Sequence, residues 1–180
     1  MPSAHEHAST LPGEADGFER LWTPHRIAYI EGERPDEAGG EGCPFCAAPG
    51  KDDETGLIVH RGELCYVVLN LFPYTPGHLL ICPYRHVPLY VDLTDEETTE
   101  FTALTKAAIG ALQAASAPMG FNLGMNQGAV AGAGVAAHLH QHVVPRWAGD
   151  ANFLPIVGRT KALPVLLEDT RQRLVEHWPA

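Results

Sequence analysis

The sequence lacks a long apolar run and is poor in positive charge. No apolar stretch approaches the roughly 20 residues of a membrane-spanning helix, and the N-terminus has neither the basic start nor the apolar core of a secretory signal peptide. The 12 lysines and arginines face 22 acidic residues, so the net charge is −10. Membrane surfaces and nucleic acids favour basic partners. We therefore expect a cytoplasmic protein that binds neither membranes nor nucleic acids.

Cysteine is also scarce, with four residues in a chain of 180. In the cytoplasm we expect thiols or metal ligands rather than disulfides. Cys65 and Cys82 stand inside apolar segments, which favours positions in the core. Cys43 and Cys46 have the spacing of a zinc knuckle. A CxxC pair can also be a redox motif, but the strand and helix pattern of thioredoxin-like proteins is absent around this one.

The acidic residues are concentrated near the N-terminus, because residues 1–57 hold 12 of the 22 acids and 4 of the 12 bases. Residues 1–17 are small and polar, which is typical of a disordered tail. The length suits one domain, which we place at residues 18–180, with a knuckle loop at 40–50 around the cysteine pair. The nearly neutral remainder is compatible with a polyphosphate ligand.

Hydrophobic spacing predicts an α+β fold in which an antiparallel sheet meander carries one long packed helix. Thr94 and Glu97 form a capping-box pattern at the start of that helix. Apolar residues at helical spacing near the C-terminus predict a further helix. The expected strands are 56–60, 64–69, 78–83, 121–125 and 137–145, and the expected helices are 18–30, 95–117 and 160–178.

The chain is rich in histidine, with ten residues, and three of them alternate in His138-Leu139-His140-Gln141-His142. Because side chains alternate along a strand, the three rings should share one face of the sheet. A solvated edge face would also explain the pattern, and so would a zinc site, although a flat strand splays its ligands. Imidazole can act as a nucleophile toward phosphorus, and the backbone amides of the glycine-rich loop 128–134 can approach an anion.

The segment His138–Val144 resembles the signature of the histidine-triad (HIT) family, His-φ-His-φ-His-φ-φ, where φ is apolar. The resemblance covers about residues 57–155. It includes Pro76-Gly77-His78 at the start of an expected strand and Pro145-Arg146-Trp147 after the triad. This similarity implies a HIT-like antiparallel sheet and a nucleotide as the small-molecule partner.

Two further segments resemble one branch of this family. Leu21–Pro24 and Gly149–Phe153 resemble the actinobacterial branch of diadenosine tetraphosphate phosphorylase-like proteins. The family resemblance also implies a homodimer, with the helix 95–117 and a neighbouring strand at its interface.

By this resemblance His140 is the nucleophile that attacks the α-phosphorus and forms a covalent nucleotidyl-histidine, which water or inorganic phosphate then cleaves. His142 would contact the phosphoryl oxygens, His138 would complete the catalytic triad, and Asn70 would hold the ribose hydroxyls. Asn70 as a turn residue and Gln127 as a solvated loop side chain are the simpler alternatives. The other expected nucleotide contacts are Asn126, Gln127, Gly132, Gly134 and Trp147.

The resemblance also implies a structural zinc ion, about one per chain. His138 would then hold the triad segment through the metal while His140 faces the phosphate. His60 is an alternative to one of the ligands, His86. The implied ligand set is Cys43, Cys46, His86 and His138.

This sequence departs from the family pattern at two places. Gln141 stands where the signature is apolar, and we expect it to point away from the catalytic face and to alter packing or an interface. Gly134 and Val135 stand where many relatives carry a serine or threonine that donates to the leaving group or to the incoming phosphate. The missing hydroxyl bears on phosphorolysis in particular.

The sequence therefore predicts an enzyme that cleaves dinucleoside polyphosphates of the diadenosine tetraphosphate type, with phosphate or water as acceptor. One alternative is a hydrolase of nucleoside phosphoramidates or AMP conjugates. Another is a nucleotide-binding module without turnover, and a third is a zinc-storage or zinc-sensing protein that binds several ions per chain.

Overall fold

The computed structural model describes residues 42–150 and 165–179. The expected tail 1–17 and helix 18–30 lie outside the described residues. Among the helices of the two described ranges, none is long and apolar enough to cross a membrane.

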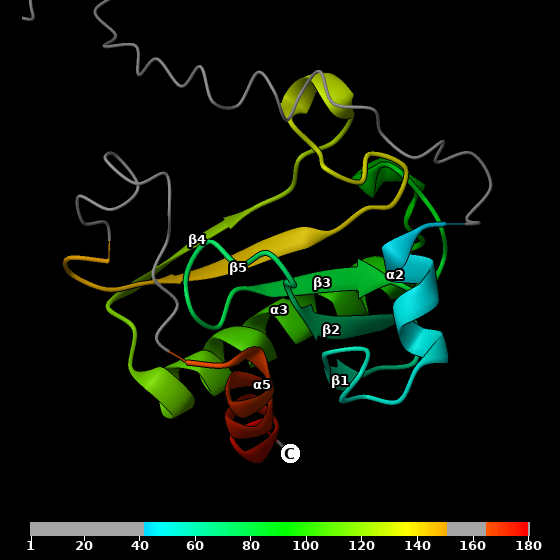
Figure 1. The fold of residues 1–180 in the computed structure, drawn as a ribbon. Coiled ribbons are helices and arrows are strands. Elements are labelled where there is room, and N and C mark those ends of the chain that lie inside the picture. The colour runs from blue at the N-terminus through cyan, green and yellow to red at the C-terminus, as the bar shows by residue number, and fades with distance from the viewer. Residues whose placement is uncertain (1–41, 151–164, 180) are drawn as a thin grey trace, which may run out of the picture. The chain divides into compact units, whose positions relative to one another are not determined.

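Five strands form one antiparallel sheet in the order β1-β2-β3-β5-β4 (Figure 1). β2 and β3 pair without interruption, with Leu69 opposite Leu79. β5 returns from late in the chain and inserts between β3 and β4. The expected α+β fold with an antiparallel sheet is confirmed, although only β1, β2 and β3 follow one another as in a meander. The strands are β1 Ile58–Arg61, β2 Cys65–Leu69, β3 Leu79–Pro83, β4 Gly120–Gly124 and β5 Gln141–Arg146.

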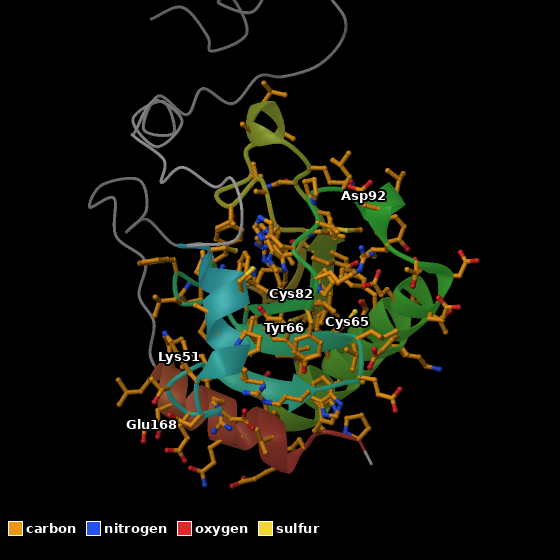
Figure 2. All side chains as sticks on the ribbon, turned by 90° about the vertical axis from the view of Figure 1, so that its right-hand side faces the viewer. Lys51, Cys65, Tyr66, Cys82, Asp92 and Glu168 are labelled. Atoms are coloured by element: carbon orange, nitrogen blue, oxygen red, sulfur yellow. The ribbon has the colours of Figure 1, made fainter. Side chains whose placement is uncertain are left out.

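The sheet separates two apolar cores, because successive side chains of each strand point to opposite faces. The long helix α3 (Asp95–Ser116) covers one face, and the short helix α2 (Pro44–Ala47) lies against the other (Figure 1). Cys65 donates through its thiol to the Glu97 carbonyl of α3 at 3.8 Å, whereas the next residue, Tyr66, donates to the Phe45 carbonyl of α2 at 2.6 Å (Figure 2). Cys65 and Cys82 are fully buried, so their expected core positions are confirmed.

The capping box at the start of α3 is confirmed. The Thr94 hydroxyl accepts from the Glu97 amide, and the Glu97 carboxylate accepts from the Thr94 amide. The same carboxylate accepts from Arg85 at 2.6 and 2.5 Å, and this guanidinium holds the pKa of Glu97 below its usual range. The buried carboxylate therefore ties the loop after β3, which carries His86, to the helix.

A shorter C-terminal helix than expected, α5 (Leu167–Glu176), closes the described chain. The first residues of the expected helix 160–178 lie outside the described residues. Arg171 donates to the Ile58 carbonyl of β1 at 2.7 Å, and Arg173 donates to the Ala115 carbonyl near the end of α3 at 2.6 Å. These contacts attach α5 to both layers.

The last strand begins at Gln141 rather than at 137 as expected. The segment before it leaves the β3 ladder, because the Leu139 amide donates to the Val87 carbonyl at 2.7 Å instead. Leu139 nevertheless packs in the core on the α3 side. The alternation therefore continues beyond the strand and directs His138 and His140 toward the α2 side.

Candidate active site and metal cluster

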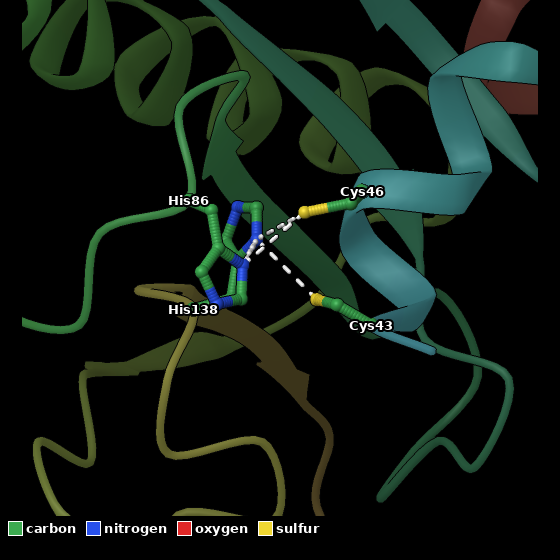
Figure 3. Close-up of side chains that lie close together, drawn as sticks. All are labelled: Cys43, Cys46, His86 and His138. Atoms are coloured by element: carbon green, nitrogen blue, oxygen red, sulfur yellow. Dashed lines mark hydrogen bonds between the residues drawn. The ribbon is translucent and has the colours of Figure 1, made fainter. Parts of the chain in front are cut away.

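Four predicted ligands from three distant segments converge at one end of the sheet (Figure 3). Their ligand atoms all lie within 4.8 Å of one another. The Cys46 sulfur lies 3.2 Å from His86 Nδ1 and 3.4 Å from His138 Nδ1, and the Cys43 sulfur lies 3.5 Å from His138 Nδ1. The two histidine Nδ1 atoms are 3.3 Å apart. The cluster consists of Cys43, Cys46, His86 and His138.

These spacings fit a tetrahedral zinc ion. With usual Zn–S and Zn–N bond lengths, the edges of such a tetrahedron are about 3.6 Å between sulfur and nitrogen and about 3.3 Å between two nitrogens. His138 Nε2 lies 2.9 Å from the Pro83 carbonyl, which can only accept, so Nε2 carries the hydrogen and the Nδ1 lone pair faces the cluster. A carbonyl that fixes the tautomer in this way is typical of metal-bound histidine.

The protonation behaviour of the cluster agrees with a cation site. Burial lowers the pKa of His138 to about 4, so the ring is neutral and able to ligate near neutral pH. Burial and the adjacent Cys43 thiol raise the pKa of Cys46 to about 11. A bound cation is what would hold this sulfur as a thiolate. His60, the alternative ligand, stacks instead on Trp178, with ring centroids 4.8 Å apart.

His140 lies directly beside the cluster and is almost fully buried. Its Nδ1 is 2.9 Å from the His138 carbonyl, so Nδ1 donates and the lone pair resides on Nε2. The Phe45 ring lies 4.8 Å from the His140 ring and 5.6 Å from the His138 ring, measured between centroids. The helix α2, which carries Cys46 and begins directly after Cys43, therefore also packs against the predicted nucleophile.

His142 is the first triad residue within β5, and it contacts a histidine that the sequence analysis left without a role. His78 Nε2 lies 2.9 Å from His142 Nδ1, and His78 is fully buried. The register places His142 opposite Leu80 on β3, so two residues upstream His78 shares its face. Burial, assisted by the neighbouring His140, lowers the pKa of His142 to about 4.

The predicted polar nucleotide contacts lie in loops and already make hydrogen bonds within the chain. The Asn70 side chain accepts from the Phe72 amide at 3.0 Å, as a turn residue would, and approaches His78 Nδ1 at 3.3 Å. Gln127 accepts from the Tyr90 amide at 2.8 Å. Asn126 donates to the Gly132 carbonyl at 3.3 Å and so braces the glycine-rich loop.

A cleft of about 900 Å³ extends from His142 along β5 to α5. Trp147 lines it, and its indole donates to the Ser116 carbonyl at 3.2 Å. Arg146 also lines it but is engaged by Asp150, whose carboxyl pKa the guanidinium lowers to about 2. Gly132, with φ of 85°, belongs to the neighbouring loop, together with the exposed Gly134.

Gln141 points away from the triad, as expected. Its side-chain amide donates to the Thr105 hydroxyl of α3 at 3.2 Å. The polar residue in this signature position is therefore accommodated by a hydrogen bond to the helix on the opposite face.

Known proteins resemble this chain in sequence. The HIT domain family model matches residues 52–149. An AP-4-A phosphorylase from Mycobacterium tuberculosis (strain ATCC 25618 / H37Rv) is 48% identical over 170 residues, which cover 92% of this chain and 87% of that protein. A bis(5'-nucleosyl)-tetraphosphatase (asymmetrical) from Schizosaccharomyces pombe is 38% identical over 96 residues, or 52% of this chain and 50% of that protein.

A solved structure has the same fold. The Zn-bound histidine triad family protein from Mycobacterium smegmatis matches with a TM-score of 0.62 at 25% identity, over 77% of this chain and 94% of that one. The family match covers more than half of the sequence, and it includes the sheet, α3 and the whole triad. This chain therefore belongs to the HIT domain family.

Proposed function

We propose that this chain is an enzyme that cleaves dinucleoside polyphosphates of the diadenosine tetraphosphate type through a covalent nucleotidyl-histidine at His140. The observation that carries the proposal is the 2.9 Å hydrogen bond from His140 Nδ1 to the His138 carbonyl, because it keeps the lone pair on Nε2. The 48% identity to a protein named AP-4-A phosphorylase supports the substrate class.

The reaction divides one difficult displacement into two easier ones. Nε2 of His140 attacks the α-phosphorus, and the bond from phosphorus to the bridging oxygen breaks as the leaving nucleotide takes that electron pair. Water or inorganic phosphate then attacks the same phosphorus, and the nitrogen–phosphorus electron pair returns to His140. The Nδ1–H···O=C hydrogen bond keeps the ring aimed throughout both steps.

Neighbouring groups would hold the substrate around His140. His142 lies 5.1 Å from His140 between ring centroids, close enough for both rings to approach one phosphoryl group. Its low pKa keeps it neutral at neutral pH. Asn70 would hold the ribose and Trp147 the nucleotide in the cleft. The remaining proposed contacts come from the glycine-rich loop and its base, at Asn126, Gln127, Gly132 and Gly134.

Product analysis with and without inorganic phosphate identifies whether phosphate or water accepts the nucleotidyl group from His140. Diadenosine tetraphosphate yields ADP and ATP by phosphorolysis, and AMP and ATP by hydrolysis. Because Gly134 and Val135 offer no hydroxyl to assist phosphate, the same panel should include adenosine phosphoramidate and dinucleotides of other chain lengths. Nucleotide binding without any product would contradict the proposed enzyme.

The role of His140 is tested with a variant and a matched control. His140→Ala should lose the covalent adduct in mass spectra and reduce turnover by at least about 10³-fold. Gln141→Leu restores an apolar residue at the adjacent position, on the α3 side, and should keep both. Full turnover in His140→Ala would overturn the mechanism.

We further propose that the cluster binds one structural zinc ion through Cys43, Cys46, His86 and His138. When bound, zinc would supply a closed four-coordinate crosslink that has no open position for substrate. Metal analysis should find about one zinc per chain, and the Cys43→Ser/Cys46→Ser double variant should lose the metal and melt at a lower temperature. His60→Gln should keep the zinc. Several ions per chain would instead favour a storage or sensing role.

We also propose that the protein works in the cytoplasm, where reducing conditions keep thiols such as Cys43 and Cys46 available as ligands. Microscopy of the tagged full-length chain tests this location. Export of the tagged chain would contradict it.

A further inference from the structure

One backbone amide and one side-chain amide both point to the Nδ1 atom of the buried His78 ring. The Tyr74 amide donates to His78 Nδ1 at 3.1 Å. The Asn70 side chain lies 3.3 Å from the same atom. Because the Asn70 oxygen accepts from the Phe72 amide at 3.0 Å, the group that faces His78 is the NH₂. His78 Nδ1 therefore accepts and carries no hydrogen.

Because Nδ1 carries no hydrogen, the protonation of the other ring nitrogen of His78, Nε2, is also determined. A neutral imidazole carries its hydrogen on one nitrogen, so His78 is protonated on Nε2. That nitrogen lies 2.9 Å from His142 Nδ1, to which it must donate. His142 Nδ1 in turn accepts, which assigns the hydrogen of His142 to its Nε2.

We infer that Asn70 and His78 are positioning residues that fix His142 in the tautomer with hydrogen on Nε2, so that His142 meets the phosphoryl group as a hydrogen-bond donor. The Asn70 side-chain amide and the Tyr74 backbone amide donate to His78 Nδ1, and His78 Nε2 donates to His142 Nδ1. The consequence for catalysis rests on the proposed function, whereas the tautomer itself is a property of the folded protein without substrate.

The direction of the hydrogen bond matters because a phosphoryl oxygen only accepts. The opposite tautomer would present a lone pair to that oxygen and would remove one donor from a site where negative charge develops. His142 is neutral near neutral pH, so a second proton does not supply the missing donor. The pairing of β3 with β5 brings His78 to His142. The site therefore depends on this pairing as well as on the triad segment.

The tautomer can be measured directly. Long-range ¹H–¹⁵N spectra of the zinc-loaded full-length protein, labelled on histidine and free of nucleotide, distinguish Nδ1–H from Nε2–H rings. His142→Gln identifies the His142 signals. We expect the Nε2–H form in the wild type and a mixture of both forms in His78→Met, whose side chain has no donor. A wild-type Nδ1–H ring, or an unchanged tautomer in His78→Met, overturns the inference.

The kinetic consequence is tested with His78→Met and its conservative counterpart His78→Gln, whose amide can still donate to His142 Nδ1. The rate of nucleotidyl-histidine formation should fall about 100-fold in His78→Met and recover most of this loss in His78→Gln, with similar melting temperatures for both variants. Equal rates in the two variants overturn the inference. Absence of the adduct in the wild type contradicts the proposed function instead, while the spectra still decide the tautomer.

Discussion

Burial lowers the pKa of His142 to about 4, and the adjacent His140 adds to the shift. His78 and Tyr74 also contact this ring. In the unfolded chain the pKa of a histidine is near 6.5. Between about pH 4 and pH 6.5 the His142 ring is therefore protonated in the unfolded state but neutral in the native state. The stability due to His142 is therefore complete above about pH 6.5 and lost as the pH falls toward about 4, by about 1–2 kcal/mol once solvent screening of the half-buried ring is included. Urea unfolding across this range measures the loss.

The control is His142→Gln in the same buffers. Both proteins contain the same cysteine and histidine cluster, so the difference between the two curves isolates His142. Curves that run parallel from about pH 7 to about pH 4 would show that His142 has an ordinary pKa in the folded protein.

At the residue scale, the sequence predicted the groups whose roles depend on local spacing and missed one that depends on strand register. Cys43 and Cys46 are close in sequence and the triad is contiguous, so a motif describes both. His78 and His142 are 64 positions apart in the sequence, and their contact requires the pairing of β3 with β5. Its place at the start of an expected strand was visible, but nothing local to it indicates the partner.

At the element scale, the helices and strands follow from pattern, whereas their ends depend on contacts from elsewhere. α3 begins where its capping box predicts. β5 begins later than its alternation predicts, because the Val87 carbonyl takes the Leu139 amide. The departure from the ladder frees the His138 segment to reach the cysteines. The position of the cysteine and histidine cluster and the start of β5 thus both depend on this hydrogen bond.

A second contact between elements links α3 to the β1–β2 turn. The Glu100 carboxylate accepts from the Glu63 and Leu64 amides at 2.7 and 2.6 Å. A Cβ added at Gly62 would overlap the Glu100 Oε1 atom and lie 2.9 Å from the Cys65 carbonyl oxygen. Gly62→Ala should displace Glu100, weaken both hydrogen bonds and destabilise the fold by about 1–2 kcal/mol, as measured by urea unfolding.

Gly110→Ala is the control for this prediction. Gly110 lies within α3, and a Cβ there meets nothing within 4 Å. This substitution should stabilise the protein by about 0.5–1 kcal/mol, because alanine loses less backbone entropy in a helix. If Gly62→Ala were equally stabilising, Glu100 would not hold the turn.

At the scale of the whole molecule, the described sheet has an edge with no neighbouring strand. Within residues 42–150 and 165–179, β4 pairs with β5 on one side and with no strand on the other (Figure 1). An unpaired edge presents backbone donors and acceptors to a second chain, and Leu123 on this strand is 50% exposed. A two-fold axis at β4 would join the sheets of two copies through an antiparallel strand pair. This surface agrees with the homodimer that the sequence predicts.

The dimer is tested by sedimentation of the full-length protein. The wild type should sediment at twice its mass of 19.5 kDa, whereas Leu123→Glu should sediment as a monomer, because a two-fold axis brings the two new carboxylates close together. Val91→Glu changes an apolar residue that is 82% exposed but belongs to the short turn before α3 and not to the β4 strand, and it should remain dimeric. A monomeric wild type, or a dimer that survives Leu123→Glu, would exclude the β4 edge as the interface.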